Sequence, residues 1–209
     1  MSDFKGFADA ALDFYEDLED DNTKSFWEAH KHVYDEQVLA PMKALTDALE
    51  PEFGTAKVFR PYRDVRFSKD KTPYKTNQGA VVSAAPATGW YVEISAAGLH
   101  AGAGFYDADA ARLAVIRRAI DEDRTGAPLD ELIAGFAADG WEIGGERVKT
   151  TPRGFPADHP RIELLRHKQL YVGHSYGTSG LNSPDVLDRV RADWTRLRPL
   201  VEWLAARQA

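Results

Sequence analysis

Residues 79–102 read GAVVSAAPATGWYVEISAAGLHAG and contain three short runs rich in β-branched and aromatic side chains. Runs of this kind are typical of β-strands. Only a few residues, among them Pro86, Gly89 and Gly98, separate one run from the next. Because connections this short join consecutive strands as antiparallel neighbours, we expect an antiparallel sheet here.

Further strand candidates lie on both sides of this stretch. Residues 57–60 and 65–67 precede it and carry the same residue types. Residues 141–143 and 147–149 are predicted to form one hairpin, and residues 169–174 a late strand.

Helices are expected before and after the strands. In residues 1–50, apolar side chains recur at steps of three and four, which predicts a helical hairpin. Asn22 or Thr23 is expected to cap its second helix, and Pro41 to kink or restart that helix. Later helices are predicted in four segments: one from about Asp107, then 129–138, 159–167, and one after Ser183-Pro184.

The order of these elements predicts an α+β fold. It consists of an N-terminal helical hairpin, a central, mainly antiparallel sheet, and C-terminal helices packed on the sheet. We predict a single domain over residues 1–209, with the hairpin in 1–52, strands in 56–105 and mixed helices and strands in 106–209. The 209 residues include no cysteine, which excludes disulfides and thiolate chemistry.

Charge is unevenly distributed along this acidic chain. The net charge is −7, yet residues 57–75 hold seven basic side chains against two acidic ones. Residues 1–52 hold four basic side chains against fourteen acidic ones. Because the whole chain repels phosphate, nucleic-acid binding through bulk charge is not expected, whereas a local anion site fits the basic segment.

No stretch of the sequence approaches the roughly 18 apolar residues of a membrane span. The first residues, MSDFKGFADAAL, lack the basic region of a signal peptide. We therefore expect a cytoplasmic protein that does not interact with membranes.

Residues 60–76, RPYRDVRFSKDKTPYKT, are the leading candidate site. Arginine forks match carboxylate or phosphate oxygens, and lysines add mobile positive charge. We predict that the segment binds a small phosphate- or carboxylate-bearing ligand. The predicted ligand-binding residues are Arg60, Arg63, Arg66, Ser68, Lys69, Lys71, Tyr74 and Lys75, with Lys31 at the edge.

Other interpretations of the same residues remain open. If residues 62–68 form a strand, Val65 and Phe67 draw Arg63 toward the core, where its charge needs a partner. The arginines and aspartates then form a structural ion-pair network, which is compatible with a protein or nucleic-acid interaction module. A third interpretation is an enzyme in which Asp64, Asp70 or a histidine acts as acid or base. No metal site or cofactor is predicted, because the histidines are scattered and no known ligand spacing occurs.

The segment at 63–76 resembles the central motif of a bacterial and fungal family catalogued as domain of unknown function 2461. The resemblance covers nearly the whole chain. It includes Asn22, Phe26-Trp27, Lys31 and Tyr34 upstream, and Lys149, Gly154-Phe155-Pro156, Asp158-His159-Pro160 and Leu164-Leu165-Arg166 downstream. It implies a single cytoplasmic α+β domain without an established biochemical role, and it assigns no catalytic residue.

Overall fold

The computed structural model describes residues 4–66 and 69–207. The chain forms two compact units, each assembled from segments that are distant in sequence. Unit 1 comprises Met1–Val82, Tyr91–Ala101 and Ser175–Ala192, and unit 2 comprises Ser83–Trp90, Gly102–His174 and Asp193–Ala209.

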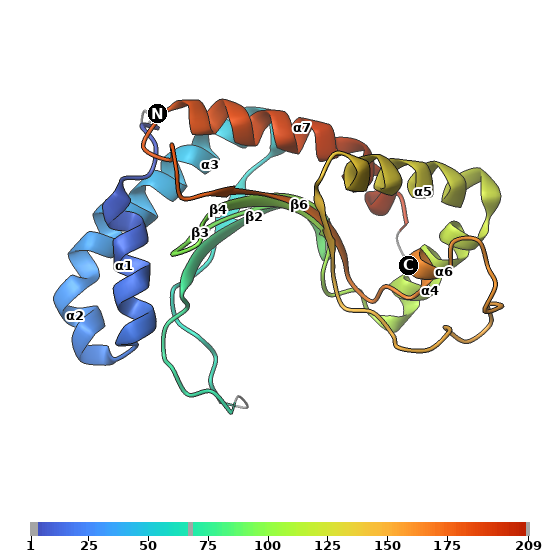
Figure 1. The fold of residues 1–209 in the computed structure, drawn as a ribbon, viewed down its shortest axis with the longest axis horizontal. Helices are drawn as coiled ribbons and strands as arrows, with labels where there is room; N and C mark the ends of the chain where they lie inside the picture. The colour runs from blue at the N-terminus through green and yellow to red at the C-terminus, as the bar shows by residue number, and fades with distance from the viewer. Residues whose placement is uncertain (1–3, 67–68, 208–209) are drawn as a thin grey trace. The chain divides into compact units, whose positions relative to one another are not determined.

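A six-stranded antiparallel sheet runs in the order β1-β2-β3-β4-β6-β5 (Figure 1). In β1 and β2, Lys57 lies opposite Val81, and in β5 and β6, Ile143 lies opposite Val172. The predicted α+β class is confirmed. The strands are β1 (Ala56–Val58), β2 (Asn77–Ala85), β3 (Thr88–Ser95), β4 (Gly98–Phe105), β5 (Glu142–Gly144) and β6 (Leu170–Gly177).

The N-terminal helices of unit 1 form the predicted hairpin. Helix α1 (Asp9–Asp20) is followed by one continuous helical rod, made of α2 (Lys24–Val33), the π-helix η1 (Tyr34–Leu39) and α3 (Ala40–Phe53). The hydroxyl of Thr23 caps α2 by accepting a hydrogen bond from the Phe26 amide. Pro41, which was expected to kink or restart the helix, lies in the first turn of α3, where the π-helix η1 passes directly into α-helix.

An aromatic cluster joins these helices to one another. The Phe14 ring of α1 lies 5.9 Å from both the Trp27 and the Tyr34 rings, and those two rings are 4.8 Å apart. All three side chains are buried. The cluster therefore holds the first turn of α2 and the start of η1 against α1.

Unit 2 contains α4 (Ala110–Asp121), α5 (Asp123–Ala138) and α6 (Ile162–Leu165), while α7 (Asp185–Ala205) contributes residues to both units. Asp109, not Asp107, caps α4. Buried arginines cap carboxyl ends of helices, where cations are favoured. Arg161 donates to the carbonyls of Ile120 and Asp121 in α4, and Arg112 donates to that of Leu204 in α7.

Two predicted elements of unit 2 differ from the structure. Residues 147–149 do not pair with 141–143. β5 instead pairs with β6, and Arg147 forms an isolated bridge with His167. The short helix predicted over 159–167 covers only Ile162–Leu165. Sequence patterning missed the strand pairing because β5 and β6 are distant in the chain.

Candidate functional site

The basic segment between β1 and β2 is a long loop whose two arms are tied together near their base. The amide of Arg63 donates to the carbonyl of Pro73 at 2.9 Å, and that of Lys75 to Pro61 at 2.7 Å. These bonds flank an isolated antiparallel bridge between Tyr62 and Tyr74. The strand considered for residues 62–68 does not form over 63–66, and its last two positions lie outside the described residues.

Asn22 fastens the returning arm of this loop to the helical hairpin. Its side-chain Nδ2 donates to the Tyr74 carbonyl, and its Oδ1 accepts from the Tyr74 amide, both at 3.1 Å. The Asn22 side-chain amide thus forms the pair of hydrogen bonds with the Tyr74 backbone that a neighbouring strand would form. Of the two residues predicted as caps, Asn22 and Thr23, it is Thr23 that caps α2.

Tyr74, a predicted ligand-binding residue, is buried at the base of the loop. Its ring stacks on Trp27, with ring centroids 4.3 Å apart and planes 8° apart. Burial raises the pKa of the Tyr74 phenol, and the neighbouring Tyr62 raises it further. The aromatic stack and the Asn22 amide together fix the base of the basic segment against α2.

Ion pairs at the outer part of the loop form within the segment itself. Asp64 accepts from Nε and Nη2 of Arg66, and Asp70 accepts from Nη1 of Arg63 at 2.6 Å. Hydrogen bonds from Arg66 lower the pKa of Asp64. Hydrogen bonds from Thr72 are the main cause of the lowered pKa of Asp70, which Arg63 lowers further. Both aspartates are therefore held as carboxylates, and both pairs are exposed.

The lysines of the outer loop are exposed. Lys71 donates to the Val65 carbonyl at 2.8 Å, and Lys69 lies on the surface. Ser68, a predicted ligand-binding residue, lies outside the described residues. This part of the loop therefore presents charge to solvent.

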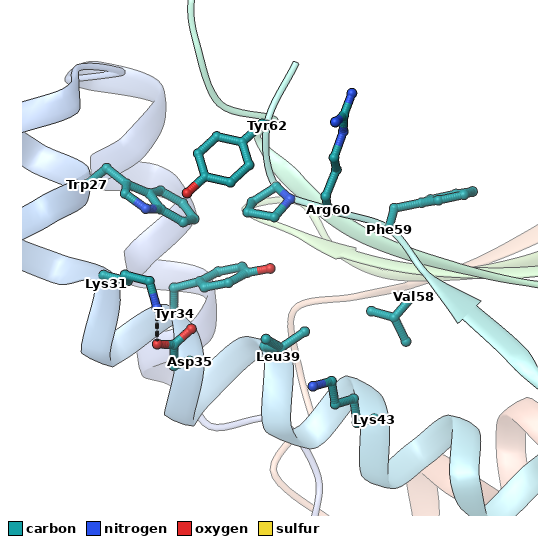
Figure 2. A pocket seen from close by; sticks show the side chains of 11 residues that line it. Trp27, Lys31, Tyr34, Asp35, Leu39, Lys43, Val58, Phe59, Arg60 and Tyr62 are labelled. Carbon is teal, nitrogen blue, oxygen red and sulfur yellow. Dashed lines mark hydrogen bonds and ion pairs between the residues drawn. The ribbon is translucent and has the colours of Figure 1, made fainter. Parts of the chain in front are cut away.

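A hollow of about 350 Å³ lies at the base of the loop, where the loop leaves β1 and passes the helical rod (Figure 2). Its volume is within the range of small-molecule sites, about 300–1,000 Å³. All of its lining residues belong to unit 1. They are Trp27, Lys31, Tyr34, Asp35, Leu39, Lys43, Val58, Phe59, Arg60, Pro61 and Tyr62.

The π-helix explains why the rod presents one continuous face to the hollow. Trp27, Lys31, Asp35, Leu39 and Lys43 follow one another at steps of four residues. In an α-helix of 3.6 residues per turn, each such step overshoots a full turn by about 40°. The wider turns of η1, in which the Ala40 amide bonds to the Asp35 carbonyl, compensate this drift. Short π-helical segments frequently occur at functional sites.

The cations around the hollow are only partly neutralised. Nζ of Lys31 lies 2.5 Å from the Asp35 carboxylate. Within residues 4–66 and 69–207, neither Lys43 nor Arg60 forms an ion pair. Figure 2 shows Arg60 at the upper rim, with its guanidinium directed away from Tyr34. Exposed side chains change rotamer in picoseconds to nanoseconds, so this charge can turn toward the opening.

Two more lysines flank the rim at Phe59. Nζ of Lys75 lies 5.1 Å from the centroid of the Phe59 ring, and that of Lys57 lies 5.9 Å from it. Burial lowers the pKa of Lys75, and the positive charges of Arg60 and Lys57 lower it further. Three like charges thus lie within electrostatic reach of one another.

The inner wall of the hollow is a buried hydrogen-bonded network. The Tyr34 hydroxyl donates to Oε1 of Gln78 at 2.5 Å, and Nε2 of Gln78 donates to the Phe59 carbonyl at 2.8 Å. Burial raises the pKa of Tyr34, and the Asp35 carboxylate adds to the effect, so the phenol stays protonated. Within the described chain, the buried Nε1 of Trp27 has no hydrogen-bond acceptor.

The structure brings only some of the predicted site residues together. Arg60 and Lys31 line the hollow, and Lys75 lies beside it. Arg63, Arg66, Lys69 and Lys71 are in the outer loop and do not line it. Sequence reasoning missed Lys43, Phe59 and Tyr62. The available signal for Lys43 was that three steps of four residues lead to it from Lys31.

The residues considered for catalysis are not part of the hollow. Asp64 and Asp70 are engaged in the exposed ion pairs described above. None of the lining residues is a histidine. Among the described residues, no group of three His, Asp or Glu side chains is placed to hold a metal ion. No helix in the described part of the chain is long and apolar enough to cross a membrane.

The fold and the hollow define an α+β protein with an aromatic, positively charged cleft in its N-terminal part. The chain belongs to the family described as conserved hypothetical protein DUF2461, whose model matches residues 10–203. This match confirms the resemblance noted from the sequence. No curated protein matches the chain with significance.

Proposed function

We propose that the protein binds a small phosphate- or carboxylate-bearing ligand in the hollow at the base of the basic loop. The observation that carries the proposal is the pair of cations at its rim, Lys43 and Arg60, neither of which forms an ion pair among the described residues, although Arg60 acts on the Asp64 carboxylate from a distance. Lys57 and Lys75 add unbalanced charge beside Phe59. A bound anion would relieve the repulsion among these groups.

The outer loop supports binding less well than its composition suggests. Its two arginines already have carboxylate partners, and those pairs are exposed to water. An anion bound to these exposed arginines would be held weakly, because ion pairs at the surface are weak and screened by salt. The site proposed here is therefore at the base of the segment, with Lys31 and Lys43 from the helical rod as additional contacts.

The test is a calorimetric titration of the protein with inorganic phosphate. Lys43→Ala with Arg60→Ala should weaken binding at least tenfold, or about 1.4 kcal/mol, because both uncompensated charges are lost. Lys69→Ala with Lys71→Ala removes the same charge from the outer loop and should change affinity less than about twofold. A larger loss in the outer-loop variant would move the site away from the hollow.

Asp35→Asn is expected to strengthen phosphate binding instead of weakening it. Asp35 lines the hollow and holds the Lys31 ammonium. Removing its charge frees Lys31 and takes away a repulsive carboxylate, so phosphate should bind several-fold more tightly. Unchanged or weaker binding in this variant would contradict an anion in the hollow.

A further inference from the structure

One side of the hollow is an aromatic wall. Trp27 from α2, Tyr34 from η1 and Tyr62 from the loop line it together, as Figure 2 shows. The Trp27 ring centroid lies 4.8 Å from that of Tyr34 and 6.1 Å from that of Tyr62. The helical rod and the loop, which are separate in sequence, thus place their rings at one surface.

Tyr62 is the solvent-exposed part of this wall. Its side chain is 49% exposed, whereas Trp27 and Tyr34 are 3% and 2% exposed. The position of Tyr62 is nevertheless fixed, because its backbone bridges to Tyr74 and its ring lies 5.5 Å from the Tyr74 ring. A large ring that is held in place but exposed to water offers a preformed surface for another planar ring.

In the rest of the lining, the apolar and the charged side chains lie in different places. Leu39, Val58 and Pro61 contribute aliphatic surface, and Lys43 and Arg60 lie at the rim. A bare inorganic anion would meet the rim charges and leave the aromatic wall exposed. A ligand with a flat apolar body and one acidic group would cover both surfaces.

We infer that the ligand is an aromatic acid: a planar ring that stacks on Tyr62 and carries a phosphate or carboxylate toward Lys43 and Arg60. This inference rests on the proposed function and specifies the ligand class for the same hollow. The volume of about 350 Å³ is near the lower end for small-molecule sites, which suits a ligand of one or two rings.

The experiment compares matched aromatic and saturated acids by calorimetry. Phenyl phosphate is measured against cyclohexyl phosphate, and benzoate against cyclohexanecarboxylate, with inorganic phosphate as the reference. We expect each aromatic acid to bind about tenfold more tightly than its saturated partner, which corresponds to about 1.4 kcal/mol. The phosphate and carboxylate pairs show which acidic group is preferred.

Two variants locate the effect. Tyr62→Leu keeps an apolar side chain but removes the ring, so each aromatic acid should then bind no more tightly than its saturated partner. Tyr106→Leu, at an exposed tyrosine of unit 2, should leave the preference intact.

Three outcomes would overturn the inference. If aromatic and saturated acids bind equally, the ring preference is wrong while anion binding stands. If the preference persists in Tyr62→Leu, the ring does not stack on Tyr62. If none of the five anions binds the unmodified protein, both the proposed function and the inference fail.

Discussion

At the scale of single residues, Asn22 and Tyr74 decide how the basic loop is placed. The Asn22 amide pairs with both backbone groups of Tyr74, and Tyr74 stacks on Trp27. An asparagine side chain can do this because its amide carries the same donor and acceptor as a peptide group. The loop is thus held by one polar and one aromatic contact to the helical hairpin.

Asn22→Ala should lower the free energy of unfolding by about 1–3 kcal/mol, since two hydrogen bonds to backbone groups are lost. It should also speed tryptic cleavage at the arginines and lysines of residues 63–71, because the returning arm is released. Urea denaturation and timed proteolysis measure the two effects. Asp21→Ala, at an exposed neighbour, is the control and should change stability less than about 0.5 kcal/mol. Cleavage at the same rate in both variants would contradict the role of Asn22.

At the scale of elements, the π-helix η1 sets the angular relation between α2 and α3. Trp27 in α2 and Met42, Leu45 and Leu49 in α3 are all buried. Both sets must face inward although they lie on one rod. The wider turns of η1 set the angle between these two buried faces.

Insertion of one alanine after Glu36 tests this relation, because the wider turns of η1 already hold more residues than an α-helix, and a further residue rotates everything beyond it by about 100°. Either α2 or α3 then turns apolar side chains toward water. The expected loss of stability is at least about 3 kcal/mol, comparable to truncating one buried leucine. Denaturant unfolding measures it, with Glu36→Ala as the control at the same exposed position. An insertion variant as stable as the substitution would show that the angle between α2 and α3 does not depend on the residue count of η1.

At the scale of the whole molecule, stability is expected to depend on pH through His167. This side chain is 3% exposed, and its Nδ1 lies 2.6 Å from the Gln169 carbonyl oxygen. Burial lowers the pKa of His167. The Gln169 carbonyl opposes this shift, Arg147 adds to it, and Glu163 also opposes it. The net result is a native state that binds the proton less readily than the unfolded chain.

The sign of the pH effect follows from this difference. An unfolded histidine takes up its proton near pH 6.5, whereas the native imidazole resists protonation. Stability should therefore be complete above about pH 6.5 and fall as the pH drops from there through the lower native pKa. His167→Gln should remove this part of the fall in urea unfolding measured from pH 7.5 to 5. The exposed His32→Gln should retain it, and identical pH profiles for all three proteins would contradict the prediction.

The helical spacing and the strand runs were readable because they are local. Phe14 and Leu18 on one helix face and the runs around Val82 and Val92 depend only on periodicity, and both proved correct. The basic segment was also found from its charge. Composition did not show that Arg66 turns back onto Asp64 and Arg63 onto Asp70.

The sequence alone determined the fold class, the helical hairpin, the family and the location of the basic segment, because each follows from short-range patterns of side chains. Only the tertiary structure decided where the candidate site lies. The hollow combines Lys43 of α3 with Tyr62 of the loop, and its geometry depends on the turn count of η1 and on the Asn22–Tyr74 contact. These are relations between residues far apart in the chain. They are set by packing and by hydrogen bonds formed on folding, which local patterns do not encode.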